Sequence, residues 1–451
     1  MSVIVQYFVI ITHIIIIASA FKISSKSDDI STEIVQTDNK TQPQQIHLSL
    51  GDNPTQMVAT WSTMSPTDTI VRYGVGQLVT VHMGTMTNFS NGVNHDQYIH
   101  SAIMDQLTPN TSYIYQVGSG NPNEMSKIYN FTTTPIGNNW SPRFCVYGDL
   151  GFINPQSYSR ILSDVNKGMY DMIIHVGDFA YDLDSNFGDM GDKFMRLMEP
   201  IAARLPYMTS PGNHENAGNF SNYKNRFRMP NNDNQNMFYS YNVGPIHFIS
   251  ISTEYYFYVN YGLMQLLNQY KWLAEELKTA NLPENRAKQP WIIVLGHRPL
   301  YCTNSDGNDC GIAADWLRYG VPFIHLLGIE DLLYLNGVDL AIWAHEHTYE
   351  RMWPVYQEKV VNSSTPGQPY FNPKATVHIV SGSAGCQEDH DEFPQVEKDY
   401  SAFHSTDYGY SRMTVYNSTH LYFEQVSDDQ KGKIIDQIWL IKTKHGSFLN
   451  D

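Results

Sequence analysis

Two patterns of apolar and polar residues divide the chain into two regions. From about residue 42 to residue 134, apolar and polar positions alternate over short stretches, and turn-forming residues separate these stretches. A period of two is typical of strands that bury one face. Residues 42–134 are therefore predicted to form a β-sandwich. The clearest predicted strands are Gln45–Leu50, Gln56–Trp61, Ile70–Tyr73 and Leu107–Val117.

After a short linker at 135–140, the pattern changes to strands that alternate with helices. The predicted helices are 155–167, 191–199 and 263–277, and the last has the apolar spacing of a helix with one buried face. Short apolar runs supply further strands, at 242–251, 376–381, 412–416, 421–425 and 438–441. Such a mixture predicts a layered α/β domain over residues 141–445.

Five further apolar runs of this region end in the same way. Each run stops at a glycine or alanine, and an Asp, Asn or His follows at once. One such motif alone, for example Asp178 with Tyr181, is explained as well by a turn aspartate and a core tyrosine. Five in series favour a ligand site, because open α/β sheets bind ligands at the carboxyl ends of their strands. The motifs are Gly148-Asp149-Leu150-Gly151, Gly177-Asp178-Phe179-Ala180-Tyr181, Gly212-Asn213-His214-Glu215, Gly296-His297 and Ala344-His345-Glu346-His347.

Residues 1–20 have the features of a secretory signal peptide. Residues 7–17 are mostly apolar, and Ala18-Ser19-Ala20 is a small-residue cleavage site. A membrane anchor is the alternative, but the run is shorter than the roughly 20 residues of a membrane-spanning helix. Residues 21–41 are mostly polar and are expected to form a flexible lead-in. We expect a soluble mature protein that is secreted or lysosomal, with no membrane partner.

Composition is consistent with secretion. The formal net charge of −16 and a pI near 5.4 argue against nucleic acid or an anionic membrane as a partner. Of the four cysteines, Cys302 and Cys310 flank a polar loop and are candidates for a local disulfide, whereas Cys145 lies in a predicted core strand. Candidate N-glycosylation sites are Asn39, Asn88, Asn110, Asn130, Asn139, Asn219, Asn362 and Asn417.

Together, the five motifs resemble those of the purple acid phosphatases, which are binuclear members of the calcineurin-like metallophosphoesterases. Tyr181 of the second motif distinguishes this family within the superfamily. Trp61 and the run 107–115 resemble a fibronectin type III module, which the plant-like long forms carry at this end. The resemblance implies a four-layer α/β/β/α sandwich for residues 141–445. One departure is Ala344, because the family's last motif usually begins with glycine.

The resemblance assigns metal-binding roles to seven residues. The first set of ligands is rich in anionic oxygen, which suits Fe³⁺, and the second has two imidazoles and an amide, which suit divalent Zn, Fe or Mn. Two metals about 3.5–4 Å apart can bind a phosphoryl oxygen, generate hydroxide and support in-line displacement. The implied ligands are Asp149, Tyr181 and His347 for the first metal, Asn213, His297 and His345 for the second, and Asp178 as the bridge.

His214 matches a family position that does not bind metal. We predict that it contacts the phosphate or protonates the leaving group, and a structural histidine behind the ligands is an equal alternative. Plant-like relatives carry further histidines in the loop after the motif that corresponds to Gly296-His297. In this chain, residues 298–311 contain none. After the last motif, Glu350 and Arg351 are predicted to form an ion pair that holds the loop.

The sequence thus predicts a secreted acid phosphatase that hydrolyses phosphate monoesters by in-line attack of a metal-bound hydroxide. A related phosphodiesterase or pyrophosphatase is one alternative, because it would share the metals and differ in the shape of the pocket. A non-enzymatic secreted binding protein that acts through the sandwich is another, although every ligand-type residue is present. No oligomeric state is predicted.

Overall fold

The computed structural model describes residues 39–91, 96–321, 325–363, 365, 367–395 and 398–450. The predicted signal peptide, residues 1–20, and all but the end of the predicted lead-in lie outside these residues. Within the described part of the chain, no helix has both the length and the apolar character that a membrane crossing requires.

The N-terminal region consists of two four-stranded antiparallel sheets. Trp61, Tyr73, Tyr115 and Phe131 are buried in the core of this region. In order across the first sheet, the strands are β1 (Gln44–Leu50), β2 (Met57–Thr63), β6 (Asp96–Met104) and β5 (Thr85–Ser90). The second sheet consists of β4 (Thr80–Met83), β3 (Ile70–Gly74), β7 (Ser112–Gly118) and β8 (Tyr129–Thr132).

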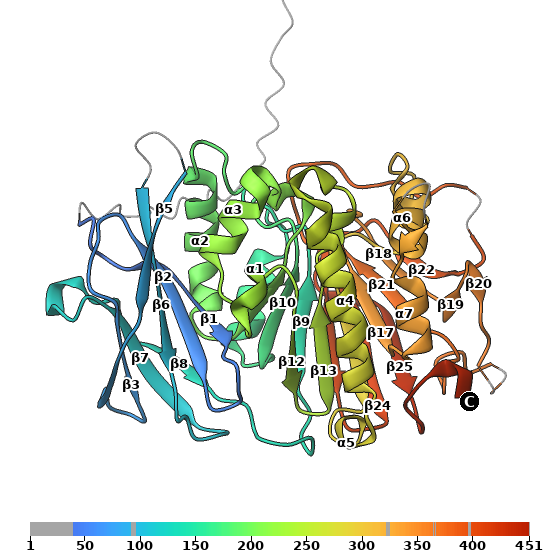
Figure 1. The fold of residues 1–451 in the computed structure, drawn as a ribbon, viewed down its shortest axis with the longest axis horizontal. Coiled ribbons are helices and arrows are strands. Elements are labelled where there is room, and N and C mark those ends of the chain that lie inside the picture. Colours follow the sequence, from blue (N-terminus) through green and yellow to red (C-terminus); the bar gives the residue numbers. More distant parts are fainter. Residues whose placement is uncertain are drawn as a thin grey trace, which may run out of the picture. The chain divides into compact units, whose positions relative to one another are not determined.

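Two larger mixed sheets follow (Figure 1). The six-stranded sheet contains, in order, β11 (Tyr207–Ser210), β10 (Met172–Val176), β9 (Arg143–Tyr147), β23 (Gly409–Val415), β24 (His420–Ser427) and β25 (Lys433–Ile441). The seven-stranded sheet contains β12 (Tyr239–Val243), β13 (Ile246–Ser250), β14 (Trp291–Leu295), β17 (Leu340–Trp343), β21 (Val377–Ser381), β18 (Tyr349–Met352) and β22 (Ser401–Ser405). Two-residue strands form the pairs β15 (Gly320–Val321) with β16 (Leu326–Leu327) and β19 (Val355–Tyr356) with β20 (Lys359–Val360).

Helices accompany these sheets and bury one face each. In α4, Leu266, Leu273 and Leu277 are buried, whereas Leu263 at its start is exposed. The helices are α1 (Tyr158–Asn166), α2 (Asp189–Ala202), α3 (Ala217–Arg226), α4 (Leu263–Ala280), α5 (Pro283–Arg286), α6 (Ala314–Tyr319) and α7 (Glu330–Leu335). Short helical turns are η1 (Pro122–Glu124), η2 (Asn213–Glu215), η3 (Asn232–Asn234), η4 (Thr253–Tyr256), η5 (Val259–Tyr261), η6 (Asp309–Ala313) and η7 (Phe448–Asn450). The predicted fold class, a sandwich followed by an α/β domain, is confirmed.

Two local predictions were wrong. Residues 242–251, predicted as one strand, form the hairpin of β12 and β13, because Gly244 takes a positive φ of 57° at the turn. Glu350 and Arg351 do not pair, since neighbouring residues of a strand point to opposite faces. In β18, Arg351 contacts Asp436 at 2.7 Å, while Glu350 accepts a hydrogen bond of 2.6 Å from the Thr303 hydroxyl.

Polar contacts join the sandwich to the end of α2 and to the end of α3. The Tyr115 hydroxyl donates to the Ala203 carbonyl at 2.7 Å, and Ala203 packs in the core of the sandwich. Arg226 at the end of α3 is 1 % exposed and donates to Asp192 at 2.7 Å and to Gln45 of β1 at 3.2 Å. A buried guanidinium thus links strand β1 to α2 and α3 of the α/β region.

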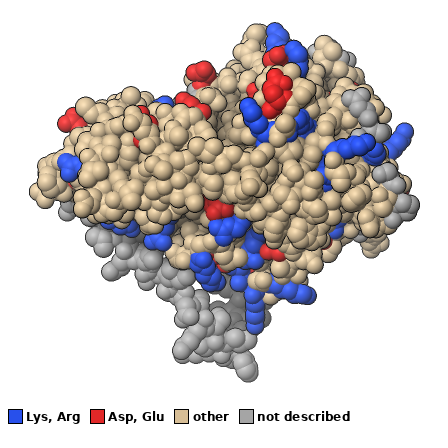
Figure 2. Space-filling model, turned by 90° about the horizontal axis from the view of Figure 1, so that it is seen from below, with Lys and Arg blue, Asp and Glu red and all other residues tan. Residues whose placement is uncertain are grey.

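Charge is not spread evenly over the surface. Figure 2 shows a face on which Lys and Arg side chains stand out and Asp and Glu side chains are sparse, although the formal net charge of the whole chain is −16. The net charge alone therefore does not describe this face, and the absence of anionic macromolecular partners stays a prediction.

Replacing Arg226 by leucine should strongly destabilise the protein, because Asp192 would remain buried without its guanidinium partner. Breaking a buried ion pair in this way costs about 3–5 kcal/mol. Urea unfolding followed by circular dichroism measures this change. Arg143→Ala is the matched control, since its 2.7 Å pair with Asp171 lies on the surface and should contribute at most about 1 kcal/mol. Equal losses for both variants would contradict the structural role of Arg226.

Candidate metal centre

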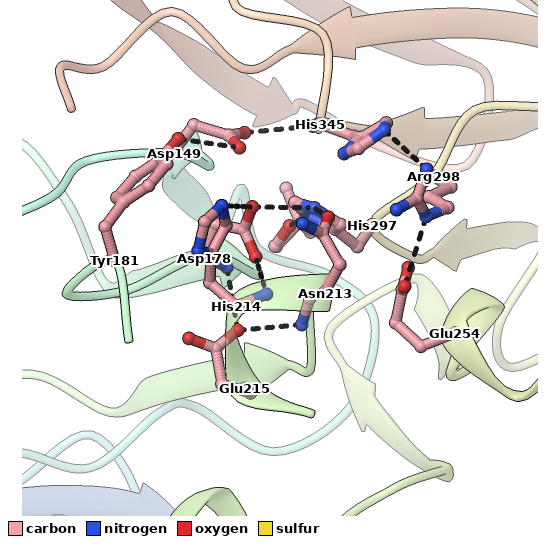
Figure 3. Close-up of polar contacts among 12 residues, drawn as sticks. Asp149, Asp178, Tyr181, Asn213, His214, Glu215, Glu254, His297, Arg298 and His345 are labelled. Atoms are coloured by element: carbon pink, nitrogen blue, oxygen red, sulfur yellow. Dashed lines mark hydrogen bonds and ion pairs between the residues drawn. The ribbon is translucent and has the colours of Figure 1, made fainter. Parts of the chain in front are cut away.

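The predicted ligands emerge from the carboxyl ends of neighbouring parallel strands. In the six-stranded sheet, Asp149 follows β9 and Asp178 follows β10, while Asn213 lies just beyond β11. In the seven-stranded sheet, His297 follows β14 and His345 follows β17. The ends of the two sheets meet here, so these side chains face one another (Figure 3). Residues 196 apart in sequence are thereby brought into contact, as the 3.0 Å bond from the backbone amide of His345 to the Asp149 carboxylate shows.

Three predicted ligands form a first group of donor atoms. The Tyr181 hydroxyl lies 2.8 Å from Nε2 of His347 and 3.3 Å from Oδ1 of Asp149. Nδ1 of His347 lies 3.1 Å from the carbonyl of Asp389, to which it donates, so the Nε2 lone pair faces the other two donors. All three side chains are buried. This carboxylate, phenol and imidazole fit a hard, highly charged cation.

The other four predicted ligands form a second group. Nε2 of His297 lies 3.0 Å from the Asn213 amide oxygen and 3.1 Å from a carboxylate oxygen of Asp178. Nδ1 of His297 donates to the Val176 carbonyl at 2.9 Å, which leaves Nε2 free to bind a cation. Donor atoms of Asp178, His297 and His345 all lie within 4.8 Å of one another. The donor chemistry of this group fits a divalent metal.

Protons compete with cations for this centre. Burial raises the pKa of Asp149 to about 7, and Asp178 contributes to this increase. Burial alone would lower the pKa of His297, but Asp178 and Asp149 raise it to about 10. In contrast, burial and the neighbouring Arg298 lower the pKa of His345 to about 3, so this ring is neutral. Metal binding must therefore displace protons from the first two groups, and metal affinity should fall as the pH falls.

The backbone is strained at four of the ligands. These residues occupy the left-handed region, which costs non-glycine residues of order 1–3 kcal/mol each. Such conformations turn the chain sharply at the end of a strand and direct the side chain into the centre. The residues are Asp149 (φ 58°), Asp178 (φ 52°), Tyr181 (φ 57°) and His345 (φ 72°).

Two glycines of the motifs make room for close approach. Gly177 has a φ of 90°, and a Cβ atom there would lie 2.4 Å from Nδ1 of His297. A Cβ atom on Gly148 would lie 2.3 Å from the methyl group of Ala344. The departure from the family pattern at Ala344 is therefore accommodated, because Gly148 faces its methyl group.

His214 lies at the edge of the centre and is partly accessible. Its backbone amide donates to Asp178 at 3.0 Å, and Nδ1 lies 2.9 Å from Asp182. Nε2 lies 3.6 Å from Glu388, and the side chain is 20 % exposed. Burial would lower the pKa of His214, but Asp178 and Asp182 raise it above its usual value. The imidazole can therefore hold a proton beside the metal ligands.

Sequence reasoning missed three charged residues beside the second group. Nη1 of Arg298 lies 2.7 Å from Nε2 of His345, and its Nε donates to the buried Glu254 at 3.1 Å (Figure 3). Asp309 lies 3.1 Å from the same His345 nitrogen. Because Nε2 faces these partners, Nδ1 is the His345 nitrogen left for a metal. Asp309 belongs to the segment that lacks the family's histidines, and Arg298 directly follows His297. Their positions in the sequence could therefore have indicated that both residues lie near the second group.

The cysteines and sequons are placed as follows. Cys302 and Cys310 form a disulfide, and Cys145 is a buried free thiol. The disulfide closes the loop that carries Asp309. Asn219 is half-buried, whereas the other sequon asparagines, Asn39, Asn88, Asn110, Asn130, Asn139, Asn362 and Asn417, are exposed.

Comparisons with known proteins agree along the chain. Residues 142–349 match the calcineurin-like phosphoesterase family, residues 375–437 the iron/zinc purple acid phosphatase-like C-terminal family, and residues 43–133 the purple acid phosphatase N-terminal domain. Acid phosphatase type 7 of Danio rerio is 50% identical over 420 residues, which cover 90% of this chain and 93% of that protein. The protein of the same name from Homo sapiens is 46% identical over 409 residues, covering 90% and 92%.

A solved structure shares the fold. The structure of purple acid phosphatase PPD1 from seeds of yellow lupin (Lupinus luteus) superimposes with a TM-score of 0.71 at 23% sequence identity. The match covers 89% of this chain and 75% of the lupin chain.

Asp178 should matter for both metals, whereas Asn213 should matter mainly for the second. We expect Asp178→Asn to lower the metal affinity of both sites by at least about 10- to 100-fold. That is the loss typical of replacing a residue that only holds a ligand in place. Asn213→Ala should empty mainly the second site. Elemental analysis of the purified variants measures this directly. An Asp178→Asn protein that retains both metals would show that the ligand assignment is wrong.

Proposed function

The chain belongs to the purple acid phosphatase family, as the five motifs predicted, and from this premise we propose that it hydrolyses phosphate monoesters at the metal centre. One observation carries the proposal: seven donor side chains converge in two adjacent groups of different chemistry. A non-enzymatic protein would have no need to bury such a set of carboxylates and imidazoles.

We assign Fe³⁺ to the first group and a divalent metal, Zn, Fe or Mn, to the second. The family itself is described as an iron/zinc family, and the assignment to individual groups rests on their donor atoms. When bound, the pair would supply Lewis acidity and a hydroxide nucleophile. Asp178 would contact both metals, because its Oδ2 lies 3.1 Å from Nε2 of His297 in the second group and its charge acts on Asp149 of the first.

The side chains around the metals hold the reacting groups in place. Val176 and Asp389 orient His297 and His347 through their carbonyls, so both imidazoles present Nε2 inward. Five of the seven predicted ligands are buried, which limits the access of bulk water to the centre. His214, whose side chain is 20 % exposed, lies at the edge of the centre, and Asp182 contacts its Nδ1 at 2.9 Å. From this position, Nε2 can deliver a proton to the leaving-group oxygen.

We also propose that the protein enters the secretory pathway and is secreted or lysosomal. A disulfide between Cys302 and Cys310 suits an oxidising compartment. Seven of the eight sequon asparagines are exposed, as glycosylation requires. We expect glycans at these seven positions, whereas the half-buried Asn219 should be modified least.

A panel of substrates tests both the reaction and His214. The wild-type protein should hydrolyse alkyl phosphates and nitrophenyl phosphate much faster than bis-nitrophenyl phosphate or pyrophosphate. A preference for bis-nitrophenyl phosphate would favour a phosphodiesterase, and a preference for pyrophosphate would favour a pyrophosphatase. His214→Ala should lose about 10²–10⁴-fold in kcat on alkyl phosphates, whose leaving group needs the proton. The loss on nitrophenyl phosphate should be smaller, because phenolate leaves readily. Equal losses on both monoesters would indicate phosphate positioning instead.

Tyr181 tests the identity of the first metal. A phenolate bound to Fe³⁺ gives a charge-transfer band in the visible, so the oxidised wild-type protein should be coloured. Tyr181→Phe should abolish the band while Asp149, Asp178 and His347 still hold the ion. Activity should survive in part, because the phenol transfers no proton in the proposed reaction. Visible spectra together with iron analysis decide the matter: a colourless, active wild-type protein with oxidised iron bound would exclude Tyr181 as a ligand.

A further inference from the structure

Glu346 lies between the two histidines of the last motif and takes no part in the metal centre described above. Its side chain is fully buried, with 0 % exposed. Neither of its carboxylate oxygens accepts a hydrogen bond. The Asn304 side chain lies beside it, and its amide also donates to Asp391 at 3.3 Å. A buried carboxylate without a partner is costly, so Glu346 must be neutralised by a proton or by a bound cation.

Two more carboxylates surround this unpaired group. One oxygen each of Asp306, Glu346 and Asp391 lie within 4.8 Å of one another. Asp306 is exposed and Asp391 is half-buried, so the cluster opens to solvent on the side of Asp306. Among the described residues, no Lys or Arg forms an ion pair with any of the three. Negative charge is concentrated here without a cation from the protein itself.

The surrounding backbone holds these carboxylates together despite their repulsion. The disulfide between Cys302 and Cys310 closes the loop that carries Asp306. The Ser305 amide bonds to the Glu392 carbonyl at 2.7 Å, which ties this loop to the segment of Asp391. The His347 amide donates to Asp391 at 2.5 Å. The cluster is therefore built from three separate segments, each fixed by its own contacts.

We propose that Asp306, Glu346 and Asp391 bind a calcium ion, at a site separate from the two catalytic metals. The three donor groups are all carboxylates with hard oxygens, and an oxygen of Glu346 also lies within 4.8 Å of donor atoms of His345 and Asp309 beside the second group. Calcium binds oxygens at 2.3–2.6 Å, so ligands on opposite sides of the ion are roughly 4.6–5.2 Å apart. Magnesium demands nearly ideal octahedral geometry at about 2.0–2.1 Å, whereas calcium accepts irregular arrangements of oxygens such as three carboxylates from separate segments. The exposed side leaves room for water ligands.

Calcium at this site would brace the second catalytic metal indirectly. The same disulfide-closed loop carries Asp309, which contacts His345 at 3.1 Å. Glu346 is the residue directly after His345 in the chain. The ion would therefore fix both segments that position this histidine, without touching the substrate.

Equilibrium dialysis of the purified holoenzyme against radioactive calcium tests the proposal directly. We expect a single calcium ion per chain, with a Kd of roughly 10⁻⁵ to 10⁻³ M and much weaker binding of magnesium. Millimolar calcium should also raise the melting temperature by several degrees, because a ligand that binds only the folded state stabilises it. Neither readout depends on the substrate, so failure here is distinguishable from failure of the proposed phosphatase reaction.

Variants locate the site. Glu346→Gln should abolish calcium binding, and Asp306→Asn, an exposed loop change that leaves the core intact, should weaken it about 10- to 100-fold. Glu392→Gln is the matched control: it removes the same charge from an exposed neighbour of Asp391 and should leave calcium affinity unchanged. Absence of calcium binding by the wild-type protein at millimolar concentration, or equal affinity of Asp306→Asn and Glu392→Gln, would overturn the proposal.

Discussion

The convergence of buried carboxylates and imidazoles at the shared edge of two sheets is the constraint on which the rest of the structure depends. Asp149 and Asp178 are almost fully buried, and such groups are unfavourable inside a protein unless cations or donors neutralise them. Each is therefore held by several contacts, such as the bond from the His345 amide to Asp149 and that from the His214 amide to Asp178. The parallel strands, the motif glycines and the aromatic core all act to keep these groups in place.

Much of this arrangement could be predicted from the sequence, because it is encoded locally. A strand, a small residue and a ligand follow one another in each motif, and parallel strands bring such ends together. The alternation of residues 42–134 likewise predicted the sandwich, although the strand expected at 107–117 begins only at Ser112, after Pro109 and the left-handed Asn110 (φ 49°). Most strands and helices, which are encoded within about ten residues, were predicted correctly, whereas the hairpin at 242–251 and the partners of Glu350 and Arg351 were not.

What could not be predicted depends on contacts between distant segments. Arg298 was visible in the sequence, but its bonds to Glu254 and His345 require the loops after β13 and β17 to meet. Asp309 reaches the same histidine only because its loop folds back and is closed by the disulfide. The expected pair of Glu350 and Arg351 failed for a related reason: once β18 forms, alternation sends the two side chains to different partners.

The left-handed backbone at Asp149, Asp178, Tyr181 and His345 has a consequence for how this protein can change. At these positions glycine would relax the main chain, while every other ordinary residue keeps the strain. Selection for thermal stability alone would therefore favour loss of the ligands, and an inactive descendant could be more robust than its parent. Four strained, non-glycine residues are what we expect of a chain whose ligands serve chemistry at the expense of stability.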